Sequence, residues 1–373
     1  MIITDITIWR VQPPTDVWHL LSITTKSGLV GWGEFTGSGH DTAAAEIIRA
    51  AADGFLGSDA LDLNSLLAPY RDFRYPPAAD KVTAVAWSAL AQALWDIRGQ
   101  AFNQPLCRLL GGTPGPVRLY ANLNRGLFRD RSPSAHGKHA ELAVKAGFAV
   151  AKCTPFDDLT PTTTNEASLA EPLERLRSAV DAVGSERIAI DCHCRFSPAL
   201  AARLLPALRA MGNFAWVEDL LAPRYHARLP ELHAAHPEIV WGTGEETLNL
   251  AMAADMFTGE TRPDIFMPDI KYICGLDEFA ASARLGMAKG CLIYPHNPSG
   301  PVSLAFSAHM AALALDAMVE YPYLAVPGQQ ILTAPHEPVE KGWYHLGDRP
   351  GLGIALSGEC LTQHGAILHS LSK

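Results

Sequence analysis

Short apolar runs alternate with amphipathic segments from Val117 onward, and this alternation constrains the fold more than any other feature of the chain. Intervening segments such as LERLRSAVDAVG and LAARLLPALRAMG have apolar residues at helical spacing and end in glycine. Strands that alternate with helices predict βα units and a parallel sheet, and seven or eight units favour a closed barrel. A weaker eighth strand is expected near Tyr323 to Val326. The clear runs are VRLYANLN, FAVAKCTP, RIAIDCHC, FAWVEDL, VWGTGEE, DIFMPD and GCLIYPH.

The segments on either side of this alternating region have a different pattern. ITDITIWRV and HLLSITTKSGLVGWGEF read as a short antiparallel meander, and TAVAWSALAQALWDIRGQAF follows as a helix. The tail returns to turn-rich strand in WYHLGDRPGLGIAL. A chain of 373 residues is long enough for two domains. We therefore expect an α+β capping domain at 1–115, completed by about 327–373, and a barrel domain at 116–326.

The composition excludes several classes of protein. Hydrophobic residues make up 48% of the chain and charged residues only 18%, so a large buried core is expected. The formal net charge of −9 argues against a nucleic-acid partner, because phosphates attract positive charge. No apolar run approaches the ~20 residues of a membrane span, which argues against a membrane partner. The opening MIITDITIWRV alternates like a strand rather than a signal peptide, so a cytoplasmic location is expected.

Acidic residues stand at the ends of three successive predicted strands. Asp191, Glu218 and Glu245 end the third, fourth and fifth runs, and each is 27 residues from the next. The carboxyl ends of barrel strands share one face, so the three carboxylates should converge there and repel one another unless a cation lies between them. Oxygen ligands with room for water and substrate favour Mg²⁺. Glu246 is a rival for Glu245, because the strand register decides which side chain points inward.

Basic and polar residues stand at the other strand ends. The second run ends with Lys152 and Thr154 on one face. The sixth ends with Asp269, followed on the same side by Lys271, and the seventh ends with His296. Histidine titrates near neutral pH and can take a proton, while a neighbouring carboxylate fixes its tautomer.

In combination these motifs resemble the enolase superfamily, and within it the mandelate racemase/muconate lactonizing enzyme family, in its mandelate-racemase-like subgroup. ALWDIRGQAFNQPLCRLLGG, GLVGWGEF and RPGLGIAL are similar to segments of the family's capping domain. IDCHCRF, WVEDLLAP and GTGEETL resemble its three metal-ligand motifs, and MPDIKYICG with IYPHN resembles its Asp–His dyad. The resemblance implies a modified (β/α)7β TIM barrel with an α+β capping domain, and symmetric homo-oligomers.

The resemblance also implies roles for individual residues. Asp191, Glu218 and Glu245 would bind Mg²⁺, and His296 would be a general base oriented by Asp269. His193, two residues after the first ligand, would face the substrate. The ammonium of Lys152, together with Mg²⁺, would stabilise the enediolate that forms when a proton next to a carboxylate is removed.

Two positions depart from the family's usual pattern. Lys-x-Lys on the second barrel strand is here Lys152-Cys153-Thr154, and Glu-Glu-Pro after the fourth strand continues with Asp219 and Leu220. The first change bears on mechanism, because the missing lysine is one of two acid/base groups. The second bears only on loop geometry.

The missing lysine favours one reaction class. A racemase needs a base on each face of one carbon, and the hydroxyl of Thr154 is too weakly basic to serve. A dehydratase needs only one base, and the same His296 could protonate the departing hydroxyl. We therefore expect dehydration of a small carboxylate substrate, in particular a sugar acid, with His193, Thr154 and Lys271 as substrate contacts. A racemase or epimerase with Lys152 or Lys271 as second base, and a non-catalytic metal-binding barrel, remain alternatives.

Overall fold

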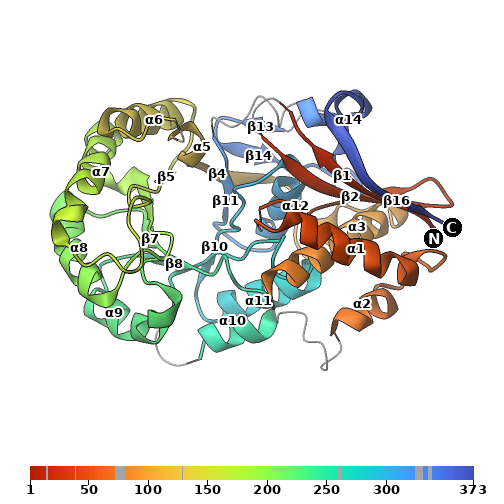
Figure 1. Cartoon of the computed structure of the whole chain (residues 1–373), viewed down its shortest axis with the longest axis horizontal. Helices are drawn as coiled ribbons and strands as arrows, with labels where there is room; N and C mark the ends of the chain where they lie inside the picture. The colour runs from red at the N-terminus through yellow and green to blue at the C-terminus, as the bar shows by residue number, and fades with distance from the viewer. Residues whose placement is uncertain are drawn as a thin grey trace.

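The computed structural model describes residues 1–13, 16–37, 39–71, 80–127, 129–258, 262–323, 331–334 and 338–373. A barrel lies beside a capping domain built on a four-stranded antiparallel sheet, and both chain ends lie on the outer side of that domain (Figure 1). No helix in the described part of the chain is long and apolar enough to span a membrane. The sheet has the order β16-β1-β2-β3, with β1 Ile3–Val11, β2 Trp18–Thr25, β3 Val30–Glu34 and β16 Gly365–Ser372.

Three helices complete the capping domain, and the longest of them packs closely on the sheet. Asp80 begins α3 by accepting a hydrogen bond from the main-chain nitrogen of Thr83 at 2.7 Å. A Cβ at Gly31 or Gly33 would lie 2.0 or 2.2 Å from carbonyl oxygens of α3, so β3 and α3 can approach this closely only with glycine there. The helices are α1 Asp41–Phe55, α2 Leu63–Arg71 and α3 Lys81–Ala101.

The alternating region forms a closed barrel, as the strand and helix pattern predicts, and it has the (β/α)7β form that the family resemblance implies. Its parallel strands follow chain order from β4 to β10, and β11 pairs with β4. The main-chain nitrogen of Glu320 donates to Pro295 at 3.2 Å and closes the ring between β11 and the end of β10. The strands are β4 Pro116–Asn122, β5 Ala151–Cys153, β6 Ile188–Asp191, β7 Trp216–Glu218, β8 Trp241–Thr243, β9 Ile265–Phe266, β10 Leu292–Ile293 and β11 Met318–Tyr321.

Helices cover the outside of these strands, and α6 to α9 form one side of the outer ring in Figure 1. The helices that connect the strands are α6 Pro133–Lys145, α7 Ala170–Val183, α8 Pro198–Met211, α9 Leu229–Ala235, α10 Leu250–Met256, α11 Leu276–Ala288 and α12 Pro301–Ala311. Shorter elements are α4 Leu106–Leu109, α5 Asn124–Leu127, η1 Glu166–Leu169, η2 Ser185–Arg187 and η3 Pro223–Arg228.

The expected position of the eighth strand was wrong. The strand that pairs with β4 is Met318–Tyr321, whereas the prediction began at Tyr323 and its residues 324–326 lie outside the described ranges. All four residues of β11 are buried, and the run is too short and too polar at Glu320 to be distinguished by hydrophobicity.

The C-terminal tail contacts both parts of the molecule. Strand β14 pairs with β4 of the barrel, and β16 pairs with β1 of the capping sheet. Buried Asp96 of α3 ties the tail to the capping sheet, because it accepts hydrogen bonds from the main-chain nitrogens of Trp32 in β3 and Leu352 in the tail at 3.1 and 2.8 Å. Burial raises the pKa of this carboxyl to about 6. The tail elements are β12 Thr333–Ala334, β13 Val339–Glu340, β14 Trp343–His345, β15 Ala355–Leu356 and α14 Gly358–His364.

Candidate active site

The first two strand-end acids lie side by side. Asp191 and Glu218 are register partners on the parallel strands β6 and β7, and both are almost fully buried. Between them lies the ammonium of Lys152, whose Nζ is 3.2 Å from Asp191 Oδ2 and 2.8 Å from Glu218 Oε1. Glu218 Oε2 accepts a second hydrogen bond from Trp216 Nε1 at 2.9 Å. A lysine from β5 is thus held at the C-terminal face of the barrel by acids from two neighbouring strands.

A fourth carboxylate, which the sequence reasoning missed, completes this buried cluster. Glu320 of β11 is fully buried and lies 3.0 Å from Lys152 Nζ. It accepts hydrogen bonds from the side chain of Asn122 and from the main-chain nitrogen of Asn297, the latter at 3.0 Å. His296 Nε2 is 3.5 Å away. The eighth strand was expected too late in the chain, although Met318 and Glu320 have the same apolar-then-charged spacing as the other strand ends.

His296 and Asp269 form a dyad on the opposite side of the barrel mouth. His296 Nδ1 lies 2.8 Å from Asp269 Oδ2, and its Nε2 lies 2.8 Å from Glu245 Oε2. Burial alone would lower the pKa of His296, but the carboxylates of Glu245 and Glu320, with the hydrogen bond to Asp269, raise it well above its usual range. The imidazole therefore has one nitrogen fixed by Asp269 and the other directed at the carboxylate cluster.

Lys271 lies behind the dyad rather than among groups that face the cleft. Its side chain is fully buried, and its Nζ contacts Asp269 Oδ1 and Oδ2 at 2.9 and 2.7 Å. Burial tends to raise the pKa of Asp269, but the ammonium of Lys271 and the imidazole of His296 hold it at about 2. We expected Lys271 to contact substrate, and this geometry turns it toward Asp269 instead.

His193 follows Asp191 in a strained backbone conformation and faces the cleft. Its φ of 44° lies in the left-handed region, which is unfavourable for a residue with a Cβ. Its Nε2 is 3.0 Å from Asp191 Oδ2 and its Nδ1 is 2.7 Å from Asp157 Oδ1. Burial lowers the pKa of His193, but these two carboxylates outweigh it and raise the pKa to about 11. Thr154, expected among the substrate contacts, donates from its hydroxyl to Asn124 Oδ1 at 2.8 Å.

The strand register also shows which of the neighbouring residues Glu245 and Glu246 points inward. Glu245 is 20% exposed and contacts the dyad, whereas Glu246 is 59% exposed and pairs with Lys81 Nζ at 2.6 Å. Lys81 belongs to α3 and lies 3.9 Å from the ring centre of Tyr272. Glu246 therefore links the capping domain to the barrel, while Glu245 points inward.

The donor set fits a hard divalent cation in its chemistry. Burial and the neighbouring carboxylates of Asp191, Glu320 and Glu245 raise the pKa of Glu218 to about 7, despite the contact with Lys152. The cluster is therefore short of positive charge, and carboxylate oxygens are the ligands that Mg²⁺ prefers. Among the described residues, no three His, Cys, Asp or Glu side chains surround one point at metal-binding distance. The carboxylates contact Lys152, His193 and His296 instead, so a bound cation would draw them away from these partners.

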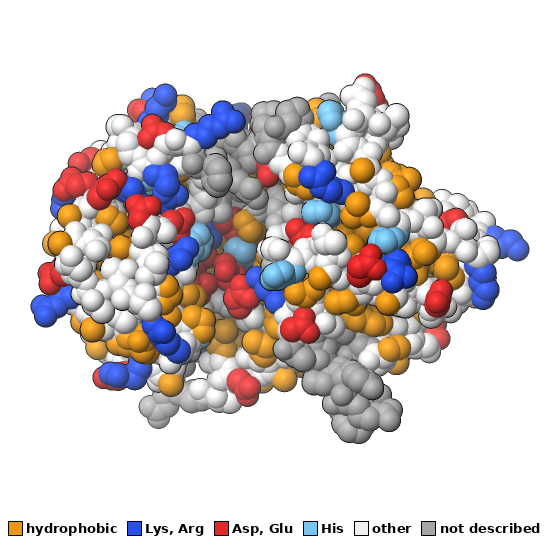
Figure 2. All heavy atoms as spheres, in the orientation of Figure 1, with side chains coloured by type: hydrophobic (Ala, Val, Ile, Leu, Met, Phe, Trp, Pro, Cys, Tyr) orange, Lys and Arg blue, Asp and Glu red, His pale blue; other side chains and the backbone are white. Residues whose placement is uncertain are grey.

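A cavity of about 1060 Å³ opens beside these groups. His193, Asp219 and Glu245 line it from the barrel, and Lys81 lines it from the capping domain. Figure 2 shows acidic and histidine side chains gathered at this hollow between the two parts of the molecule. A space of this size accommodates a small organic acid.

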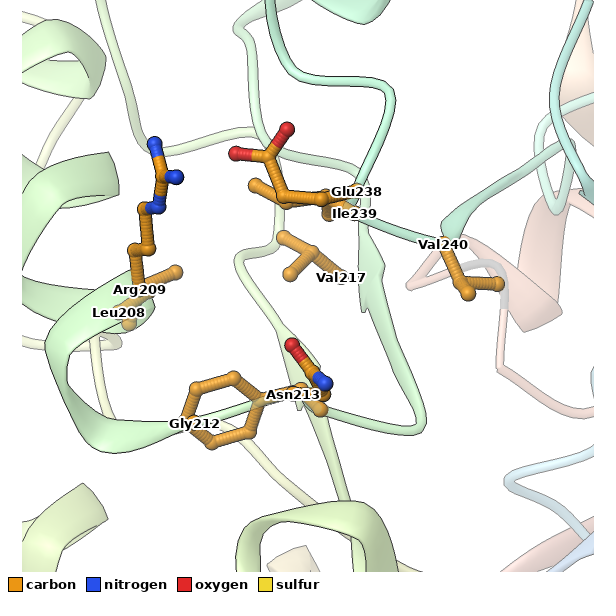
Figure 3. Close-up of a pocket in the computed structure, with 9 residues that line it drawn as sticks. Leu208, Arg209, Gly212, Asn213, Val217, Glu238, Ile239 and Val240 are labelled. Carbon is orange, nitrogen blue, oxygen red and sulfur yellow. The ribbon is translucent and has the colours of Figure 1, made fainter.

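A second hollow lies at the other end of the strands (Figure 3). Leu208 and Gly212 line it from the end of α8, and Ile239 and Val240 line it from the segment before β8. Its volume is only about 20 Å³, roughly the space of one water molecule. The strand-end acids lie at the opposite end of the barrel, so this hollow is not part of the candidate active site.

Comparison with known families identifies the family of this chain. Residues 136–360 match the model described as enolase C-terminal domain-like, and residues 11–111 match the mandelate racemase/muconate lactonizing enzyme N-terminal domain. The chain belongs to the mandelate racemase/muconate lactonizing enzyme family of the enolase superfamily. The expected family and fold class are therefore confirmed.

Individual members of the family resemble the chain over nearly its whole length. It is 27% identical to D-galactonate dehydratase of Klebsiella pneumoniae (strain 342), over 95% of this chain and 92% of that one. It is 28% identical to D-galactonate dehydratase of Verminephrobacter eiseniae (strain EF01-2), over 96% and 92%. A solved mandelate racemase/muconate lactonizing enzyme from Jannaschia sp. CCS1 superposes with a TM-score of 0.86 at 26% identity, covering 98% and 97%. This family member is an enzyme of the dehydratase type.

Proposed function

We propose that this enzyme removes water from a sugar acid in a Mg²⁺-dependent reaction. The observation that carries the proposal is the pairing of one His–Asp dyad with a second histidine across the barrel mouth. His296 follows β10 and His193 follows β6, which are four strands apart around the barrel. The D-galactonate dehydratases that resemble the chain support an aldonic acid, such as D-galactonate, as the substrate class.

His296 is the proposed base. Its Nδ1 is engaged by Asp269, so Nε2 is the nitrogen that takes the proton next to the substrate carboxylate. A bound cation would draw Glu245 away from Nε2 and lessen the negative charge that raises the pKa of His296, which would free this nitrogen to accept the proton. Lys271 keeps Asp269 ionised and in place through two contacts of its ammonium. The dyad is therefore held in one orientation before substrate arrives.

The negative charge that develops on the substrate carboxylate needs a cationic environment. Lys152 supplies a fixed ammonium, oriented by Asp191, Glu218 and Glu320. Asp191, Glu218 and Glu245 are the proposed Mg²⁺ ligands, and a bound Mg²⁺ would polarise the carboxylate as a Lewis acid.

His193 is the proposed acid for the second half of the reaction. As the bond between the β-carbon and its hydroxyl breaks, the electron pair left by the α-proton forms a carbon–carbon double bond. The proton on His193 Nε2 goes to the departing oxygen, and water leaves. The resulting enol tautomerises to a 2-keto-3-deoxy acid. His193 replaces His296 here as the acid that we first expected, because the two rings approach the site from opposite sides.

The geometry offers little support for racemisation. A second base would have to be Lys152 or Lys271, and each of these ammonium groups is buried among carboxylates. Burial lowers the pKa of Lys152, but the carboxylates around it outweigh burial and raise that pKa well above its usual range. The ammonium of Lys271 is taken up by both carboxylate oxygens of Asp269.

The test is a screen of aldonic and aldaric acids with the purified enzyme and Mg²⁺ in D₂O. We expect a 2-keto-3-deoxy product with deuterium introduced at C3, followed by NMR. Interconversion of stereoisomers without loss of water would instead identify a racemase or epimerase. A protein that binds Mg²⁺ but neither exchanges an α-proton nor forms product with any acid would contradict the proposal.

A further inference from the structure

An arginine, an aspartate and a histidine form a line of contacts beside the candidate acid. His193 Nδ1 lies 2.7 Å from Asp157 Oδ1, and Arg131 Nη1 lies 3.6 Å from Asp157 Oδ2. Arg131 is itself anchored, because its Nη2 donates to the main-chain oxygen of Thr154. The side chains of Arg131, Asp157 and His193 are 24%, 27% and 33% exposed, and His193 is the member of this line that lines the cleft.

These contacts determine which nitrogen of His193 faces the cleft. The contact with Asp157 engages Nδ1, which leaves Nε2 beside Asp191 at the barrel mouth. The main-chain nitrogen of His193 donates to Asp191 Oδ1 at 3.0 Å, and the residue has a positive φ. A strained backbone of this kind persists only where surrounding contacts hold it. Asp157 supplies the contact that holds Nδ1 of the ring, on the side away from Asp191.

The same strand end lacks the family's second lysine. Thr154 stands in that place, and its hydroxyl is turned toward Asn124. The guanidinium of Arg131 brings a positive charge to this strand end, but arginine does not release its proton and cannot act as a base. The group that the arginine stabilises here is the carboxylate of Asp157, which in turn orients His193.

We propose that Asp157 is a positioning residue for His193 and that Arg131 holds Asp157 in that role. The inference rests on the proposed dehydration, because the ring so oriented presents Nε2 to the β-hydroxyl. If the ring loses this contact, Nε2 faces the hydroxyl only part of the time. Cleavage of the carbon–oxygen bond then slows, while removal of the α-proton by His296 continues.

The decisive variant is Asp157→Asn in the Mg²⁺-loaded full-length enzyme, assayed with D-galactonate or the best acid of the screen. We expect formation of the 2-keto product to fall about 10–100-fold, the usual cost of losing a carboxylate partner of a functional histidine. Entry of deuterium at C2 of the recovered substrate should continue, so the ratio of exchange to dehydration rises at least tenfold. The analogue with fluorine in place of the C3 hydroxyl should lose far less rate, because fluoride departs without a proton.

Asp158→Asn is the matched control. Asp158 is the next residue, is half-exposed, and pairs with Arg175 rather than with the histidine. The control should keep the wild-type ratio of exchange to dehydration. Arg131→Gln should change the ratio in the same direction as Asp157→Asn but by less, about threefold to tenfold, since Asp157 still reaches the ring.

A second measurement does not depend on turnover. The ¹⁵N signals of the His193 ring, assigned with His193→Gln, should shift in Asp157→Asn and stay unchanged in Asp158→Asn. Unchanged ring signals, or parallel loss of exchange and dehydration in Asp157→Asn, would overturn the positioning role. If the wild type dehydrates no acid while the ring signals shift as expected, the proposed function fails and the contact between Asp157 and His193 stands.

Discussion

The interior of the barrel has two layers of opposite character, separated by two residues on seven of its eight strands. Because alternate residues of a strand point inward, an inward apolar residue on each of these seven strands is followed two positions later by an inward polar or charged one. The apolar layer contains Tyr120, Val150, Ala189, Trp216, Met267, Tyr294 and Met318. The polar layer contains Asn122, Lys152, Asp191, Glu218, Asp269, His296 and Glu320.

The two layers contribute differently to the molecule. The apolar layer packs tightly, with the rings of Trp216 in edge-on contact with Tyr120 and Tyr294 at 4.9 and 5.7 Å between centres. The polar layer buries four carboxylates and balances them with lysine and histidine, an arrangement that costs desolvation free energy. We infer that the first layer supplies stability and the second supplies chemistry at the expense of stability. Trp216 connects them, because its Nε1 donates to Glu218.

The sharpest test of this division is His296→Asn in the polar layer. Removing a general base costs about 10²–10⁴-fold in rate, so α-proton exchange and turnover should both fall to near background. Thermal stability measured with saturating Mg²⁺ should change little, because the bound cation would then neutralise the carboxylate cluster and Lys271 still pairs with Asp269. NMR in D₂O and calorimetry measure the two effects.

His309→Asn is the control for this variant. His309 is equally buried, but its ring bonds the main chain of Cys107 and Leu352 outside the site. This control should lose stability and keep exchange, the reverse of His296→Asn. Wild-type exchange in His296→Asn would show that another group is the base.

The strand pattern accounts for what could be predicted from sequence. Apolar runs that end in Asp191 and Glu218 identify both a strand and its charged end, so fold class and these positions follow from spacing alone. Glu320 was missed for a physical reason. Its strand is short and carries a buried charge in its own third position, where a hydrophobicity pattern expects an apolar residue.

The sequence pattern does not predict contacts between side chains that come from separate loops. The sequence places Asp157 after the second strand and His193 after the third, but only the folded loops bring their atoms to 2.7 Å. Lys271 shows the same limit. It follows Asp269 by two residues, so alternation puts both on one side, yet whether the ammonium faces substrate or the carboxylate depends on side-chain packing.

Glu218→Gln tests how much stability the polar layer costs. Its effect should be smaller than that of His296→Asn. If Glu218 is a ligand as proposed, its loss should weaken Mg²⁺ binding by more than the 10–100-fold typical of a ligand's hydrogen-bond partner. The stabilisation that Mg²⁺ gives, about 2.7 kcal/mol at a hundred times its Kd, should then largely vanish at the same concentration. Without metal, the variant should unfold at nearly the wild-type temperature, because the pKa of Glu218 is about 7 and its carboxyl is already partly protonated.

Calorimetry with EDTA and with Mg²⁺ separates these two effects. Asp158→Asn is again a suitable control, since Asp158 lies outside the buried cluster. An unchanged response of Glu218→Gln to Mg²⁺ would show that the ion binds elsewhere, and the polar layer would then lose its proposed role.

Tyr120→Phe makes the smallest change and tests the apolar layer. The hydroxyl of Tyr120 is buried and has no hydrogen-bond partner among the described residues, so it carries a desolvation cost without compensation. The phenyl ring would keep its edge contact with Trp216 and its face 5.7 Å from Lys152 Nζ. We therefore expect the free energy of unfolding to stay the same or rise by up to about 2 kcal/mol, with little change in turnover.

Trp216→Phe on the same face, which loses volume and the hydrogen bond to Glu218, should instead lower the free energy of unfolding by about 1–3 kcal/mol. Chemical denaturation with fixed Mg²⁺ compares the two variants. A loss above about 1 kcal/mol in Tyr120→Phe would mean that the hydroxyl is hydrogen-bonded, and that the polar layer reaches as deep as Tyr120 on β4.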